Sequence, residues 1–215
     1  MPSLDEVDQR AWNERTQRLL EESYLQARTG PGGSGCGHDE AGWERRRRPL
    51  VEAFDRSGTW LDVGCANGYL LETLPVWAGR RGFRLEPFGL ELIPSVADVA
   101  RTRLPHLAEH IYTGDVTEWE PPRRWTFVTA LMDAVPPSGL ADLVHRLLER
   151  FAEPGGRIII SSYGSSRLRE PAEAVAERLV ADGFEVAGSA RAIVSAIIVT
   201  QTAWIDADSR AEAGP

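Results

Sequence analysis

The stretch Thr59-Trp-Leu-Asp-Val-Gly-Cys-Ala-Asn-Gly68 decides the fold, because a short apolar segment runs directly into a loop that contains two glycines. Residues 59–63 are typical of a buried strand, and the residues from Tyr69 onward are typical of a helix. Glycine at positions 64 and 68 lets the backbone turn tightly and approach a ligand closely. A strand, a glycine loop and a helix in this order indicate the start of a parallel α/β sheet.

The alternation of strand and helix continues along the chain. Strands are expected over 59–63, 85–90, 110–113, 125–131 and 157–161, and helices over 69–77, 95–103, 139–151 and 170–182. Two more strands, 184–190 and 196–204, have no helix between them, so they should pair antiparallel at one edge. The sequence therefore predicts an α/β, Rossmann-like, doubly wound fold, with a seven-stranded, mostly parallel sheet and helices on both faces.

The residues before this core follow a different pattern. Residues 5–26 have an imperfect helical period, and a second helix is expected over 39–56. Between them, Thr29-Gly-Pro-Gly-Gly-Ser-Gly-Cys-Gly-His38 is too rich in glycine for a helix or strand, so residues 29–38 should form a flexible loop. We expect a single domain with three parts: a helical lid (1–56), a core (57–205) and a frayed tail (206–215).

Composition places the chain among ordinary globular proteins. Its 215 residues are 42% hydrophobic and 26% charged, with a formal net charge of −8. This acidic balance disfavours nucleic acid as a partner, because phosphates favour a basic surface. The run Arg45-Arg-Arg-Arg48 is the exception. We expect it to be a solvated helix face, with contact to an anionic substrate, a phosphate or a nucleic acid as the alternative.

Several classes of protein are not expected. No apolar run approaches the roughly 20 residues of a membrane span, and the acidic start does not resemble a signal peptide, so we expect a cytoplasmic protein. The two cysteines and four histidines are too scattered for a metal site or a disulfide framework. The sequence does not indicate an oligomeric state.

Acidic side chains lie at the ends of four of the expected strands. Asp62 suits a cationic ligand better than a pyrophosphate, and its loop lacks the G-x-G-x-x-G spacing of a dinucleotide site. Glu91, Asp115 and Asp133 follow the next three strands along the chain. Because the carboxyl ends of parallel strands meet at one edge, these acids should share one pocket. Capping of a loop, turn or helix is the alternative role for Asp62, Glu91 and Asp115.

The segment from Leu61 to Gly68 resembles the first motif of the class I S-adenosylmethionine-dependent methyltransferases, an acid followed by glycines at alternate positions, with Ala66 in a glycine position. The run Gly37-His-Asp-Glu-Ala-Gly-Trp43 is similar to one in small methyltransferases of actinobacterial type. The resemblance implies S-adenosyl-L-methionine as the cofactor, S-adenosyl-L-homocysteine as the product, and transfer of a methyl group to an oxygen or nitrogen of a small-molecule acceptor.

The resemblance also implies roles for individual residues. Glu91 would bind the ribose hydroxyls, and Asp115 would bind the adenine amino group. The expected cofactor-binding residues are Asp62, Gly64, Cys65, Ala66, Asn67, Gly68, Glu91, Leu92, Asp115, Val116 and Met132. Enzymes that methylate base amines resemble one another in an Asn/Asp-Pro-Pro-aromatic run after the fourth strand. This chain has Asp133-Ala-Val-Pro-Pro-Ser138 there, so nucleic-acid bases are not expected as acceptors.

Methyl transfer mainly requires alignment of the acceptor and exclusion of water, and a base is needed only if the acceptor must lose a proton. Asp133 and His38 are the candidate bases, with a solvated loop histidine as the alternative for His38. The hydroxyl of Tyr163 could orient the acceptor. Two other functions remain open: a non-catalytic protein of the same fold that binds the cofactor or its product, and a nicotinamide-dependent oxidoreductase.

Overall fold

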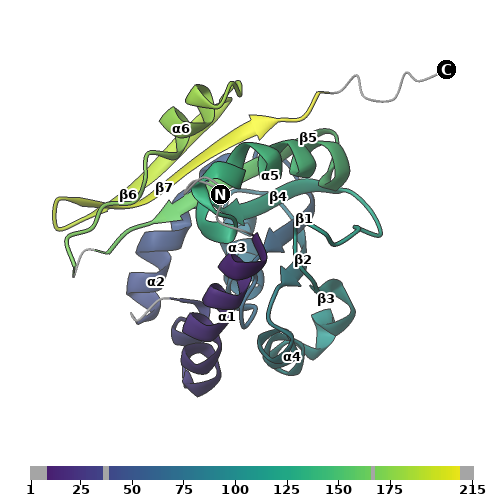
Figure 1. Ribbon diagram of the computed structural model, residues 1–215, viewed down its shortest axis with the longest axis vertical. Coiled ribbons are helices and arrows are strands. Elements are labelled where there is room, and N and C mark those ends of the chain that lie inside the picture. Colours follow the sequence, from purple (N-terminus) through teal and green to yellow (C-terminus); the bar gives the residue numbers. More distant parts are fainter. Residues whose placement is uncertain (1–8, 36–38, 166–167, 209–215) are drawn as a thin grey trace, which may run out of the picture.

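The computed structural model describes residues 9–35, 39–165 and 168–208. Its strands form one seven-stranded sheet in the order β3-β2-β1-β4-β5-β7-β6 (Figure 1). The strands are β1 (Gly58–Val63), β2 (Leu85–Glu91), β3 (Ile111–Thr113), β4 (Trp125–Leu131), β5 (Ala152–Tyr163), β6 (Gly188–Val194) and β7 (Ile197–Asp206). The first five strands pair in parallel, whereas β7 pairs antiparallel with both β5 and β6. The predicted sheet, including its antiparallel edge, is confirmed.

Helices cover both faces of this sheet, and α1 lies across the carboxyl ends of its strands (Figure 1). The α-helices are α1 (Gln9–Gln26), α2 (Glu40–Arg47), α3 (Tyr69–Gly79), α4 (Pro94–Arg103), α5 (Leu140–Arg146) and α6 (Val175–Ala181). Helices α5 and α6 pack on one face, and α2, α3 and α4 pack on the other. Within the described ranges no helix is both long enough and apolar enough to cross a membrane.

Side chains of β1 alternate between the two faces, as the pleat of a strand requires. Leu61 and Val63 join the apolar cluster beneath α5 and α6, whereas Trp60 joins the cluster beneath α2 and α3. Asp62 has the same parity as Trp60, so its carboxyl lies on the α2 and α3 side. Glu91, the last residue of β2, faces the same side, because it lies an even number of residues after Leu85, which packs beneath α2 and α3. The pleat therefore places acids from two neighbouring strands on the same face.

The helix expected over 39–56 divides into two parts. Helix α2 ends at Arg47, and residues Arg48–Ala53 form the 3-10 helix η2. Pro49 explains the change, because it has no N–H to continue the α-helical hydrogen bonds. The helix expected over 170–182 is also shorter and begins only at Val175. Before it, the backbone N–H of Ala172 donates to Ile198 O at 2.8 Å, so this segment is held against β7.

Other element boundaries also differ from the prediction. Helix α5 continues as a π-helical turn over Leu147–Phe151. Strand β5 begins at Ala152 instead of 157, so it also includes residues 153–156. Strand β6 begins at Gly188 instead of 184, because the N–H of Phe184 donates to Leu179 O and completes the end of α6.

Apolar residues of the segment 43–54 pack in the same cluster as Trp60 of β1. Trp43, Leu50 and Phe54 are buried there beside Trp60. By contrast, α1 has no buried residue. The expected boundary at residue 56 therefore does not mark a break in packing, and the division into lid, core and tail stays a prediction.

Arg157 of β5 ties η2 to the sheet from a buried position. Its Nη1 donates to Ala53 O at 2.6 Å, and its Nε contacts Asp206 Oδ1 at 2.6 Å. Its Nη2 lies 3.1 Å from Asp55 Oδ2. These three contacts join the segment before β1 to the two strands beyond β4.

We expect Arg157→Met to lower the free energy of unfolding by about 1–3 kcal/mol, because the buried carbonyl of Ala53 would lose its donor. Urea denaturation monitored by tryptophan fluorescence would measure the change. Arg48→Met is the matched control and should change stability by less than about 0.5 kcal/mol, because Arg48 makes an exposed pair with Glu44. Equal losses in the two variants would contradict the role of Arg157.

Candidate active site at the carboxyl ends of β1, β2 and β4

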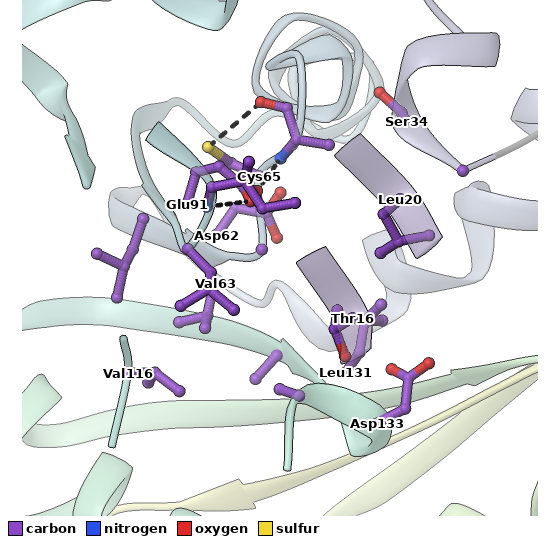
Figure 2. A pocket seen from close by; sticks show the side chains of 18 of the residues that line it. Thr16, Leu20, Ser34, Asp62, Val63, Cys65, Glu91, Val116, Leu131 and Asp133 are labelled. Carbon is purple, nitrogen blue, oxygen red and sulfur yellow. Dashed lines mark hydrogen bonds between the residues drawn. The ribbon is translucent and has the colours of Figure 1, made fainter. Parts of the chain in front are cut away.

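A cavity of about 590 Å³ opens at the carboxyl ends of the strands, where the order of the sheet reverses between β1 and β4. Ligands of open α/β sheets bind at this point, and the volume lies in the usual range for a small-molecule site. Figure 2 shows Thr16 and Leu20 of α1 across the cavity from Asp62 and Glu91. Helix α1 thus supplies one wall of the site.

The loop after β1 has a strained backbone. Gly64 and Gly68 take positive φ values of 80° and 76°, and Ala66 also takes a positive φ of 49°. Such a backbone is easy for glycine but costs about 1–2 kcal/mol for alanine. A Cβ on Gly64 would meet no atom within 4 Å, so open space adjoins the backbone there. Alanine at position 66 therefore differs from glycine in two ways: it adds a methyl group, and it holds a positive φ that is unfavourable for alanine.

Glu91 fastens this loop to the end of β2. Its Oε2 accepts the N–H of Ala66 at 2.8 Å, and its Oε1 accepts the N–H of Ile93 at 3.0 Å. Burial raises the pKa of the Glu91 carboxyl, and the two backbone hydrogen bonds oppose that rise. Each oxygen keeps a second lone pair for a ligand that lies in the cavity.

Asp62 is bonded to the neighbouring strand β4. The Thr129 hydroxyl accepts a hydrogen bond from the Trp60 indole N–H at 2.9 Å and donates one to Asp62 Oδ1 at 2.7 Å. Burial raises the pKa of Asp62 to about 7, and the hydrogen bond from Thr129 offsets part of that rise. Asp62 is therefore an acid that a cationic ligand would ionise.

Asp115, which follows β3, has two different partners. Its Oδ1 accepts the backbone N–H of Thr117 at 2.9 Å and so closes a turn. Its Oδ2 accepts the side-chain amide of Asn13 of α1 at 2.6 Å. Both the capping alternative and a place in the pocket hold for this residue, because Asp115 also lines the cavity.

The structure brings most of the expected site residues together. The cavity is lined by Asp62, Gly64, Cys65, Ala66, Glu91, Leu92, Asp115, Val116, Asp133 and Tyr163. Asn67, Gly68 and Met132 are not among the lining residues. His38 lies outside the described residues.

Asn67 binds a neighbouring segment of the protein. Its amide nitrogen donates to Gly30 O at 3.0 Å, and its Oδ1 accepts from the hydroxyl of Ser34. Residues Gly32–Ser34 form a 3-10 turn, and Gly33 is buried against Asn67. The described part of the glycine-rich run, expected to lack helix and strand, therefore has a regular turn that packs on the loop after β1.

Asp133 and Tyr163 lie on the β4 and β5 side of the cavity. Burial raises the pKa of the Asp133 carboxyl, while Arg47 lowers it. Burial also raises the pKa of the Tyr163 hydroxyl, so Tyr163 stays neutral near pH 7. The indole N–H of Trp12 in α1 donates to the backbone oxygen of Asp133 at 3.0 Å. Helix α1 thus contacts both sides of the site, at Asp115 and at Asp133.

Arg47 and Trp43, which were not among the expected site residues, also line the cavity. The run of four arginines was expected to be a solvated face, but Arg46 and Arg47 are buried, at 6% and 7% exposure. The spacing of Trp43, Arg47 and Leu50 is that of one helix face, a signal that could have revealed this. Among the residues described, no group of histidine, cysteine and acidic side chains could hold a metal ion.

Comparison with known proteins is consistent with this geometry. A family model described as a methyltransferase domain matches residues 37–189, and the chain belongs to this family. No curated protein sequence matches the chain.

Solved structures show the same fold at low sequence identity. A 1,6-didemethyltoxoflavin-N1-methyltransferase from Burkholderia thailandensis is 15% identical, with a TM-score of 0.62 over 94% of this chain and 91% of that chain. Magnesium protoporphyrin IX methyltransferase from Synechocystis is 12% identical, with a TM-score of 0.58 over 93% and 97% of the two chains. A glycopeptide N-methyltransferase is 20% identical, with a TM-score of 0.53 over 73% and 87% of the two chains.

The raised pKa of Asp62 predicts that its ionisation opposes folding. The unfolded chain releases this proton near pH 4, whereas the folded protein keeps it up to about pH 7, so the free energy of unfolding falls as the pH rises between these values. Asp62→Asn removes the titration and keeps an oxygen that can accept the hydrogen bond of Thr129. Without ligand, we expect the free energy of unfolding of the variant to rise relative to that of wild type by about 2–4 kcal/mol between pH 4 and pH 8.

Urea denaturation of both proteins at pH 4, 6 and 8 would measure this difference. Asp208→Asn, at an exposed acid, controls for removal of one negative charge. A constant difference between Asp62→Asn and wild type over the whole range would contradict the prediction.

Proposed function

We propose that this methyltransferase transfers the methyl group of S-adenosylmethionine to an oxygen or nitrogen of a small-molecule acceptor. The observation that carries the proposal is the grouping of Asp62, Glu91 and Asp115 in one cavity beside the open face of Gly64. The solved relatives support the same assignment. The enzyme from Burkholderia thailandensis was determined with 1,6-didemethyltoxoflavin and S-adenosylhomocysteine bound, and magnesium protoporphyrin IX methyltransferase with S-adenosylmethionine bound.

The residues of the site fit this cofactor. The buried carboxylate of Glu91 can accept from the two ribose hydroxyls with its remaining lone pairs. Asp115 Oδ2, which Asn13 contacts, offers an acceptor for the adenine amino group. Leu92 and Val116 give apolar contact for the ring. Burial raises the pKa of Asp62, and a positive charge of the bound cofactor near this carboxyl would favour its ionised form and form a favourable pair with it.

When bound, S-adenosylmethionine supplies a methyl group already activated on a positively charged sulfur. The residues of this chain then have to align the acceptor and keep water out. Asp133 would accept the proton that an O–H or N–H acceptor releases, and a carboxyl with a raised pKa is a better base for this step. Tyr163 would orient the acceptor, because its neutral hydroxyl can donate or accept a hydrogen bond.

Helix α1 serves as a lid in this proposal. It contacts the site through Trp12 and Asn13, yet it buries none of its own residues. Weak packing with a few polar contacts allows a segment to open at low free-energy cost. Opening of α1 would admit ligands, and closing would exclude water from the cavity.

Binding measurements test the cofactor assignment. In differential scanning fluorimetry, S-adenosylmethionine and S-adenosylhomocysteine at a hundredfold excess over Kd should stabilise the protein by about 2.7 kcal/mol, or roughly 5–10 °C in Tm. NAD should give no shift. Glu91→Gln should weaken S-adenosylhomocysteine binding roughly 10- to 100-fold, because the neutral amide has one acceptor oxygen where the carboxylate has two.

Glu86→Gln, at an exposed position of the same strand, is the matched control and should bind S-adenosylhomocysteine like wild type. The proposal fails if neither sulfur compound binds the wild-type protein, or if NAD gives the larger shift.

A further inference from the structure

Arg47 is a buried cation that faces the cavity without an acceptor. It is 7% exposed and lines the cavity on the side of Tyr163. Its two neighbours in sequence have partners: Arg46 donates to Gly164 O at 2.9 Å, and Arg48 pairs with Glu44 at 3.3 Å. Within residues 9–35, 39–165 and 168–208, no oxygen accepts a hydrogen bond from Arg47.

Aromatic rings fix the position of this guanidinium. Its central carbon lies 3.4 Å from the centroid of the Tyr163 ring and 4.7 Å from that of Trp43. Stacking of this kind occupies the face of the planar group and leaves its N–H donors free in the plane. Those donors form a fork that matches the two oxygens of a carboxylate.

A buried guanidinium without an acceptor is unfavourable, and a ligand anion would relieve that cost. The carboxyls of Asp62 and Asp133 are near enough to interact with Arg47 through their charge, but neither bonds to it. Of the expected cofactor contacts, Glu91 ends β2 and Asp115 follows β3, whereas Tyr163 ends β5 on the other side of the point where the strand order reverses. Arg47 stacks on Tyr163 and therefore lies on the side of the cavity away from the expected ribose and adenine contacts.

We propose that the methyl acceptor is a small aromatic carboxylic acid whose carboxylate binds the N–H edge of Arg47. This inference rests on the proposed function and adds the chemical class of the substrate. The rings of Trp43 and Tyr163 give the acid an aromatic surface, and Asp133 lies on the same side of the cavity to receive the proton of its nucleophilic group.

The test compares benzoate with benzamide, which has a similar shape but no charge. Isothermal titration calorimetry is done on protein saturated with S-adenosylhomocysteine. Wild type should bind benzoate at least tenfold more tightly than benzamide. Arg47→Gln should lose at least tenfold in benzoate affinity, and Arg47→Lys should lose a smaller factor because it keeps the charge but not the fork. Arg48→Gln, at the exposed neighbour, should bind benzoate like wild type.

Two results would overturn the inference. The first is a wild-type protein that binds S-adenosylhomocysteine but does not prefer benzoate to benzamide, or binds neither. The second is a loss of S-adenosylhomocysteine affinity in Arg47→Gln with unchanged affinity for 5′-methylthioadenosine, which lacks the carboxylate. That result would assign Arg47 to the carboxylate of the cofactor.

A second pair of measurements separates this inference from the proposed function. S-adenosylhomocysteine binding by wild type is measured first, and its absence would count against the proposed function itself. If Arg47→Gln does not fold, as judged by its thermal transition, Arg47→Lys carries the comparison. Unchanged benzoate affinity in Arg47→Lys would then overturn the inference, because a lysine cannot reproduce a bidentate contact.

Discussion

The hydrogen bond from Thr129 to Asp62 joins β4 to β1 at the point where the order of the sheet reverses. The indole of Trp60 donates to the same hydroxyl, so three buried polar groups form one chain between the two strands. Buried polar groups are tolerated when each has a partner, and such networks hold neighbouring strands in one arrangement. The geometry of the cavity follows from this link, because the glycine loop starts at Gly64, two residues after Asp62.

The pleat of the sheet explains why the polar side chains of the site gather on one face. Alternate residues of β1 and β4 face the same apolar layer, and the residues of opposite parity pack beneath α5 and α6. At the carboxyl ends this parity leaves Asp62, Glu91, Thr129 and Ser161 on the side of α2 and α3. The same side receives Arg47 from the end of α2. Acids and one buried cation thus face a common space that no strand or helix fills.

Much of the site could be predicted from residue types and spacing. The acids after successive strands converge because parallel strands end at the same edge, and the cavity lining includes Asp62, Glu91, Asp115 and Asp133. Details that depend on partners far along the chain could not be predicted. The expected role of Asn67 in cofactor binding stays a prediction, but its side-chain contacts with Gly30 and Ser34 could not be foreseen, because the local motif carries no information about them.

The sequence by itself determined the class of fold, the glycine loop and the edge of the sheet where the acids meet, because these depend on local periodicity and on strand order. Only the tertiary structure decided which arginine of the run 45–48 enters the cavity. The run itself gives no signal of direction, the spacing from Trp43 and Leu50 indicates only that Arg47 shares their helix face, and whether that face is buried depends on how α2 packs on the sheet. Packing places Arg47 against Tyr163, more than a hundred residues later in the chain, and turns it from an expected surface charge into part of the site.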